Sequence, residues 1–167
     1  MSNSGSHREP QQRGQLELLF DRACTRYDEG NIRSAFRLFL AAAKGGDSGA
    51  QLSLGNLYID GAGVKRNRLQ ALYWYRRAYR QGYAPAAANI GVVFRDEMKL
   101  RRALMWFERA VKLKDADANL EIAKIYLQRG DWTRAASHLR RICKAKVGDV
   151  TEASREEAQR LLKQLGR

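Results

Sequence analysis

Three stretches of similar sequence decide the fold of this chain: ALYWYRRAYRQG at 71–82, ALMWFERAVKLK at 103–114 and AASHLRRICKAK at 135–146. Each begins with an alanine, these alanines are 32 residues apart, and the apolar positions follow the i, i+3, i+4 spacing of an amphipathic helix. A second motif lies upstream of each one: AQLSLGNLY at 50–58, AAANIGVVF at 86–94 and ANLEIAKIY at 118–126. Repetition at a period of this length predicts stacked pairs of antiparallel helices.

The second motif carries a small residue three positions before an aromatic one, at Gly55, Gly91 and Ala123. Glycine inside a helix costs about 1 kcal/mol relative to alanine, so these positions predict close packing between helices rather than hinges. The aromatic pairs at 74–75 and 106–107 are expected to lie in the core, rather than to stack on bases or ligands.

The repeats divide the chain into three parts. Residues 1–14 are polar and rich in Ser, Gly and Gln, which predicts a disordered tail. Residues 15–149 are expected to form a repeat domain of about four helix pairs, the first of them a degenerate copy. Residues 150–167 carry an apolar stripe on a final helix, which predicts the cap that helical arrays need at their ends. The predicted fold class is an all-α solenoid with a C-terminal capping helix.

The first complete unit closely resembles a Sel1-like repeat, in the residues Ala50, Leu54, Gly55, Tyr58, Gly61, Gly63, Ala71, Trp74, Tyr75, Ala78 and Gly82. The two units that follow have shorter connections and resemble the related tetratricopeptide repeat. His138 and Leu139 depart from the aromatic pair of the other units, so the last unit is the loosest match. The resemblance implies a non-catalytic adaptor or scaffold that binds other proteins in a concave groove, without a cofactor.

Composition excludes several classes of protein. Two cysteines among 167 residues do not make a disulfide-stapled secreted domain, and no apolar run reaches the roughly 18 residues of a membrane span. No signal-peptide pattern is present, so a cytoplasmic location without a membrane partner is expected. The sequence DGAGVKRN at 60–67 lacks the glycine spacing and the Lys-Ser/Thr pair of a phosphate-binding loop. With two histidines and no metal-spaced cluster, we predict no catalytic, metal-binding or cofactor-binding residues.

A partner-binding groove is expected along the first helices of successive pairs. Its predicted residues are Tyr27, Asn56, Ile59, Val92, Arg95, Lys124 and Leu127. This mixture of apolar and cationic side chains would suit an extended or helical partner segment of acidic and apolar character. The clamp with which tetratricopeptide adaptors hold chaperone C-termini is not expected, because its cations are missing and acids stand at Asp117 and Glu121.

The formal net charge of +13 is the other prominent feature of the sequence. Applied along the second helices, the repeat spacing predicts a basic stripe on the outer face: Lys44, Arg77, Arg80, Arg109, Lys112, Arg141 and Lys144. A solvated face is the first interpretation, ahead of contact with an acidic protein surface or with nucleic acid. The preferred function is a protein-binding adaptor. The alternatives are a nucleic-acid-associated protein that binds weakly through this stripe, and an effector or inhibitor of an acidic partner.

Overall fold

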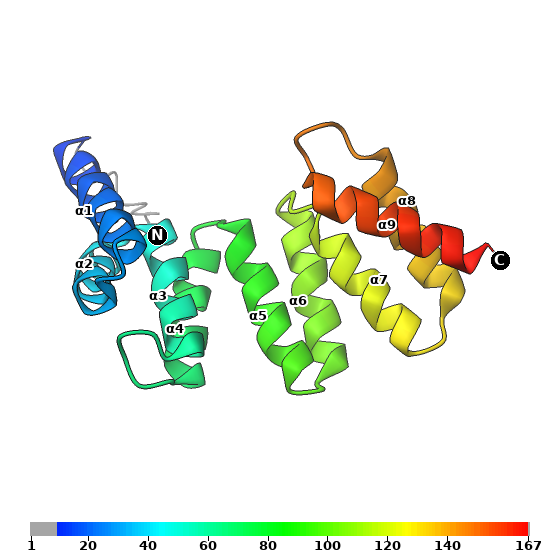
Figure 1. Ribbon diagram of the computed structural model, residues 1–167, viewed down its shortest axis with the longest axis horizontal. Coiled ribbons are helices and arrows are strands. Elements are labelled where there is room, and N and C mark those ends of the chain that lie inside the picture. The colour runs from blue at the N-terminus through cyan, green and yellow to red at the C-terminus, as the bar shows by residue number, and fades with distance from the viewer. Residues whose placement is uncertain (1–9, 167) are drawn as a thin grey trace, which may run out of the picture. The chain divides into compact units, whose positions relative to one another are not determined.

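The computed structural model describes residues 10–166, and this part of the chain folds into nine α-helices with no strand (Figure 1). The helices are α1 (Pro10–Asp28), α2 (Ile32–Gly45), α3 (Ser48–Asp60), α4 (Arg68–Tyr79), α5 (Ala84–Asp96), α6 (Leu100–Lys112), α7 (Ala118–Gln128), α8 (Trp132–Lys144) and α9 (Glu152–Leu165). Consecutive helices pair across short turns, as α1 does with α2, α5 with α6 and α7 with α8. The all-α fold class predicted from the repeats is confirmed.

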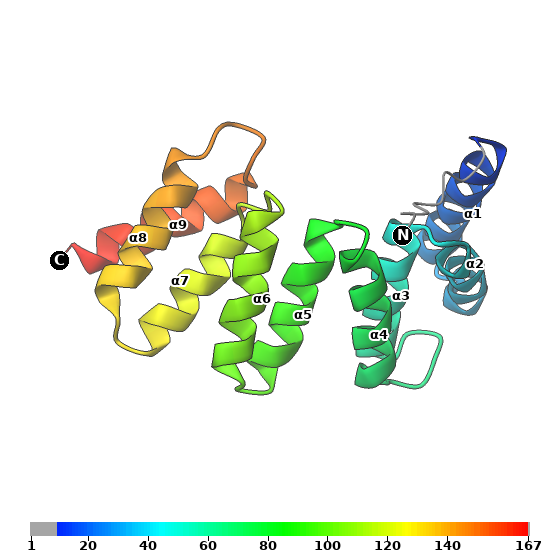
Figure 2. The same ribbon diagram turned by 180° about the vertical axis from the view of Figure 1, so that it is seen from behind.

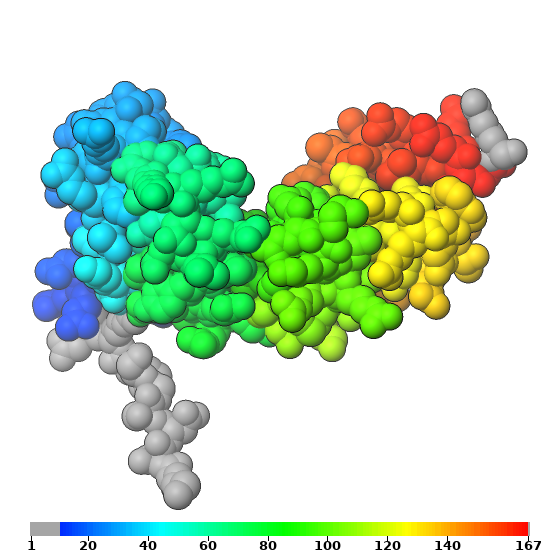
Figure 3. All heavy atoms as spheres, turned by 90° about the horizontal axis from the view of Figure 1, so that it is seen from below, coloured from blue at the N-terminus to red at the C-terminus, as the bar shows by residue number. Residues whose placement is uncertain are grey.

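The chain forms two compact units, Met1–Ala78 and Tyr79–Arg167. Unit 1 holds α1 to α3 and nearly all of α4, and unit 2 holds α5 to α9. In Figure 3 the colour runs from blue to green over the atoms of unit 1 and from green to red over those of unit 2. We call the odd-numbered helices A helices and the even-numbered ones B helices.

The N-terminal helix begins earlier than the sequence predicts. Residues 10–14, which were expected to belong to the disordered tail, form the first turn of α1, and residues 1–9 lie outside the described part of the chain. Proline suits the first turn of a helix because its missing N–H has no partner there. Glutamine and arginine, which follow at Gln11, Gln12 and Arg13, are good helix formers even when they bury nothing. Local propensity therefore extends the helix beyond its buried portion.

The A helices from α1 to α7 each carry a small buried residue that corresponds to a large buried residue of the next B helix. The contact is direct for Gly55 with Tyr75 and for Gly91 with Phe107. At the corresponding positions, Ala23 and Phe39 belong to one core cluster, and Ala123 and Leu139 to another. A Cβ atom on Gly91 would lie 2.7 Å from Cε1 of Phe107, and one on Gly55 would overlap the Tyr75 ring. The prediction that the small residues allow close helix packing is confirmed.

The pairing predicts a compensating double substitution. Gly91→Ala should destabilise the protein by about 1–3 kcal/mol, because overpacking against Phe107 outweighs the roughly 1 kcal/mol gained in helix propensity. Adding Phe107→Leu should recover part of that loss, since alanine and leucine occupy these places in the last repeat as Ala123 and Leu139. Urea unfolding of the single and double variants measures the coupling. Strictly additive effects would show that the two positions do not share one packing site.

The connection between α3 and α4 packs against the start of α2 and is held by hydrogen bonds at its end. Gly63 has a φ of 68° and lies so close to the start of α2 that a Cβ would fall 2.9 Å from Cγ2 of Ile32. The Asn67 amide donates to the Tyr58 carbonyl at 2.8 Å, and the Asn67 side chain accepts from the Gln70 amide at 3.1 Å. These contacts fix the position of the connection, and Asn67 caps the first turn of α4.

Unit 2 ends with α9 packed against α8, which lies behind α9 in Figure 1 and in front of it in Figure 2. Thr151 begins α9 by accepting a hydrogen bond from the Ser154 amide at 3.2 Å. Arg155 donates to the carbonyls of Cys143 and Ala145, each at 3.0 Å, and so satisfies acceptors at the end of α8. The final helix predicted from residues 150–167 is therefore present, with bounds 152–165.

Candidate functional site

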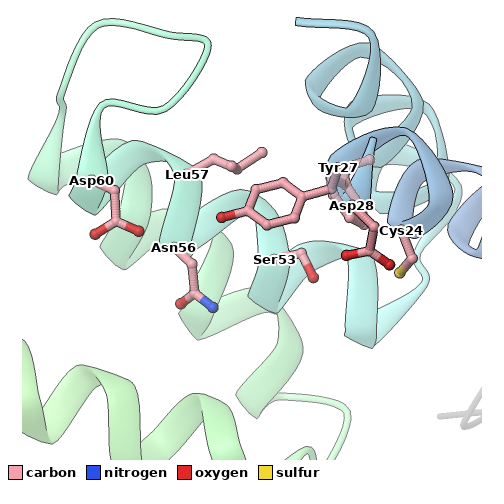
Figure 4. Close-up of a pocket in the computed structure, with 8 residues that line it drawn as sticks. Cys24, Tyr27, Asp28, Ser53, Asn56, Leu57 and Asp60 are labelled. Atoms are coloured by element: carbon pink, nitrogen blue, oxygen red, sulfur yellow. The ribbon is translucent and has the colours of Figure 1, made fainter. Parts of the chain in front are cut away.

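In unit 1, the facing sides of two A helices line a pocket of about 230 Å³ (Figure 4). Its residues are Cys24, Tyr27 and Asp28 of α1, Phe39 of α2, and Ser53, Asn56, Leu57 and Asp60 of α3. Phe39 and Leu57 are only 4% and 3% exposed and form an apolar wall. Two predicted groove residues, Tyr27 and Asn56, lie here together, whereas Ile59 is not part of the lining.

The polar groups of this pocket are acidic or neutral. The Tyr27 ring points across the opening toward Leu57 and Asn56 (Figure 4). The Asn56 Oδ1 atom accepts a hydrogen bond from the Tyr75 hydroxyl at 2.7 Å, which orients the amide. Burial, followed by the charge of Asp28, raises the pKa of the Cys24 thiol and keeps it protonated. The pocket therefore combines an apolar wall with a negatively charged opening.

Asp28 and Asp60 were not among the residues predicted for the groove, because the family pattern points to cations and asparagines on the A helices. A usable pattern was present in the sequence. The two aspartates follow predicted groove residues, Asp28 directly after Tyr27 and Asp60 one turn after Asn56. Asp60 stands directly before Gly61, and Asp28 two residues before Gly30, where the backbone takes a positive φ.

In unit 2, the A helices carry a row of alternating charges that we call the charge ladder. It consists of Arg95 on α5, Glu121 and Lys124 on α7, and Glu157 and Arg160 on α9. Arg95 pairs with Glu121, and the Lys124 Nζ atom lies 3.4 Å from Glu121 and 3.2 Å from Glu157. Arg160 lies 3.6 Å from Glu157 and completes the row. The two predicted groove cations are thus paired with acids, one of which comes from the final helix.

Reversing the two predicted groove cations, Arg95 and Lys124, should therefore alter stability. Arg95→Glu with Lys124→Glu would place four carboxylates in a row and is expected to cost about 1–3 kcal/mol. Partly exposed ion pairs contribute up to about 1 kcal/mol each, and repulsion replaces three pairs of the ladder and the Arg95–Asp96 pair. Adding Glu121→Lys, Glu157→Lys and Arg160→Glu restores the alternation and should recover most of the loss. Urea unfolding at low and high salt measures both effects, and equal stability of all three proteins would show that the ladder contributes nothing.

His138 occupies the position that Trp74 and Trp106 hold in the other repeats. Its Nδ1 atom lies 2.9 Å from Oδ1 of the buried Asn119, and its ring stacks on Tyr126 with centroids 5.8 Å apart. Burial, and then the positive charge of Arg141, lowers the pKa of His138. The imidazole thus fills an aromatic position of the repeat as a neutral ring.

The lowered pKa predicts a loss of stability in acid. Because the folded state disfavours the protonated ring, this contribution is complete above about pH 6.5 and is lost as the pH falls from there toward the lowered pKa. His138→Phe keeps an aromatic ring that does not titrate. The free energy of unfolding of the wild type should therefore fall more than that of His138→Phe between pH 7.5 and pH 5. A constant difference between the two proteins over this range would contradict the assignment.

The basic stripe predicted on the outer face contains two kinds of side chain. Arg77 and Arg109 are half-buried, and their guanidinium carbons lie 5.3 and 4.4 Å from the ring centroids of Trp74 and Trp106. Such cation–π contacts are part of the packing of each repeat. The other members of the stripe have exposed side chains: Lys44, Arg80, Lys112, Arg141 and Lys144.

Neither a metal site nor a membrane span is found in residues 10–166. No group of three or more His, Cys, Asp or Glu side chains in this range could hold a metal ion. No helix within it is both long and apolar enough to cross a membrane. Cys24 and Cys143 are free, half-buried thiols that pack against the cores of unit 1 and unit 2, respectively.

Comparison with known proteins identifies the repeats. The Sel1 repeat family model matches residues 22–47, 48–83 and 87–115, which together make up more than half of the chain. This chain belongs to the Sel1 repeat family. The three matched segments correspond to the pairs α1–α2, α3–α4 and α5–α6. The Sel1 fold is generally a scaffold for protein interaction, and Sel1 repeat proteins are typically non-catalytic.

Solved structures share the fold. A Sel1 repeat protein from Oxalobacter formigenes is 26% identical with a TM-score of 0.69, over 93% of this chain and 66% of that one. A protective antigen of uropathogenic Escherichia coli, described as displaying an SLR fold, is 19% identical with a TM-score of 0.72. That match covers 92% of this Sel1 chain but 34% of the antigen, so the chain spans about a third of it. No match was found among curated proteins.

Proposed function

We propose that this Sel1 repeat chain is a non-catalytic adaptor that binds a segment of a partner protein on the A-helix faces of its units. The pocket of unit 1 is the observation that carries the proposal. It lies between two A helices, it joins an apolar wall to polar groups at the opening, and an aromatic side chain borders it. Concave sites of this composition are where protein interfaces concentrate binding energy.

The A-helix face of unit 2 supports the same role through apolar contacts. Val92 and Leu127 are half-buried on α5 and α7, beside the charge ladder. Because Arg95 and Lys124 are already paired with acids, this face offers little unbalanced positive charge. Unit 2 should therefore bind the partner segment mainly through apolar side chains. Arg95 and Lys124 give no support to the expectation that the partner segment is acidic.

A cytoplasmic location is part of the proposal. Cys24 and Cys143 are both free thiols, which suits a reducing compartment.

Affinity capture from native lysate tests the adaptor function and separates it from binding of nucleic acid. The chain is compared with an A-face variant, Val92→Ser with Leu127→Ser, and with an outer-face variant that carries Glu in place of Arg80, Lys112 and Lys144. The adaptor predicts that the A-face variant loses the partner, that the outer-face variant keeps it, and that nuclease has no effect. Far-UV circular dichroism establishes that both variants are folded. Loss of the captured material on nuclease treatment, or in the outer-face variant alone, would favour the nucleic-acid alternative.

A further inference from the structure

The pocket of unit 1 is negatively charged, although the protein as a whole is strongly basic. The chain carries a formal net charge of +13, yet the ionised side chains of the lining are Asp28 and Asp60, and no lysine or arginine lines the pocket. Neither carboxylate forms an ion pair with any residue of the described range. The nearby Arg26 on α1 is paired with Glu29 at 2.8 Å instead.

Both carboxylates lie at helix C-termini, where a negative charge destabilises the helix. Asp28 is the last residue of α1, and Asp60 is the last residue of α3. The carbonyl groups at a helix C-terminus carry partial negative charge, so an aspartate there is repelled and a cation is attracted. Both residues line the same pocket, and Figure 4 shows their carboxylates on opposite sides of the Tyr27 ring. Residues that oppose stability at a shared pocket indicate a binding function.

The size of the pocket limits what it can hold. A volume of about 230 Å³ is smaller than the roughly 300–1,000 Å³ of sites for drug-sized ligands and cofactors, and fits a single side chain. Leu57 and Phe39 offer apolar surface for a methylene stem. The Tyr27 ring, 43% exposed, offers a face on which a planar cation stacks.

We propose that this pocket binds an arginine side chain of the partner segment. The guanidinium stacks on the Tyr27 ring, where the carboxylates of Asp28 and Asp60 on either side of the ring attract its charge, and its methylene groups contact Leu57. Lysine would gain the same charge interaction without the planar stacking on Tyr27, and should bind more weakly. The inference rests on the proposed adaptor function and deepens it, because it assigns a basic residue to the segment held by unit 1.

A titration followed by ¹H–¹⁵N NMR tests the assignment without knowledge of the partner. The probe is N-acetyl-arginine-N-methylamide, and the citrulline derivative serves as its neutral analogue of equal shape. The arginine probe should shift the amide signals of Tyr27, Asn56 and Leu57 and saturate in the millimolar range, whereas the citrulline probe should not. The lysine derivative should give smaller shifts at the same signals.

Substitutions of the carboxylates complete the test. Asp28→Asn with Asp60→Asn should weaken binding of the arginine probe at least tenfold, with a melting temperature that is unchanged or higher. The control is Asp21→Asn, which removes one carboxylate from an exposed position of α1 outside the pocket and is compared with Asp28→Asn alone as well as with the double variant. It should leave binding within twofold of the wild type.

Three results would overturn the arginine site: equal shifts with the citrulline probe, undiminished binding by the double variant, or an equal loss in Asp21→Asn. Capture of the partner by the double variant with undiminished affinity would also count against it, and would leave the adaptor function standing. Failure of the adaptor function appears separately, as capture that does not depend on the A-face residues Val92 and Leu127.

Discussion

Trp106→Ala should lower the free energy of unfolding by about 3–5 kcal/mol, because it removes a large buried ring and leaves a cavity. Trp106 is 8% exposed, and the Arg109 guanidinium covers its ring at 4.4 Å. The substitution removes this cation–π contact together with the buried area. Urea unfolding followed by far-UV circular dichroism measures the change.

Trp132→Ala is the matched control, since it makes the same chemical change at a residue that is 58% exposed. It should cost less than about 1 kcal/mol, as surface substitutions usually do. Equal losses in the two variants would show that Trp106 does not belong to the core of its repeat. Free quenching of Trp106 fluorescence by iodide in the native protein would lead to the same conclusion.

Removal of the last helix should have the second large effect. A chain that ends at residue 149 loses the apolar side chains with which the segment after it completes the core of unit 2, namely Val150, Ala158, Leu161, Leu162 and Leu165. At roughly 1.5–3 kcal/mol for each large apolar side chain that is fully buried, the expected loss is about 5 kcal/mol. The face of Leu120, Leu139 and Ile142 would be uncovered, so we also expect aggregation. Thermal unfolding with light scattering measures both effects.

Arg155→Ala separates two contributions of this helix. It retains the apolar contacts but removes the hydrogen bonds to the carbonyls of Cys143 and Ala145, and should cost less than the truncation. An unchanged melting curve for the truncated chain would show that α9 does not cap the repeats.

The fold could be predicted because its cause repeats in the sequence. Gly91 and Phe107 are 16 residues apart, as are Ala123 and Leu139, so the same spacing of a small and a large residue occurs more than once in the sequence. The start of α1 could not be predicted in this way. No buried position marks Gln11 to Arg13, and only weak helix propensity distinguishes those residues from a tail.

The charges of the site were the harder part to predict. The repeat spacing places Arg95 and Lys124 on A helices, but it does not reveal which side chains of neighbouring helices they meet. Glu157, the second partner of Lys124, lies on the final helix, outside the repeat register from which the groove was predicted. Pairing of charges depends on side-chain geometry across helices, and periodicity along one helix does not carry that information.

Site-specific photocrosslinking in cells tests most directly the claim that the A-helix face binds a partner protein. Benzoylphenylalanine would replace Tyr27 on the A-helix face of unit 1 and, as a matched control, Tyr73 on B helix α4. Both are exposed tyrosines, at 43% and 49%, so the substitution is conservative at each site. We predict a defined protein adduct from position 27 and none from position 73. An adduct formed at position 73 and not at position 27 would contradict the account.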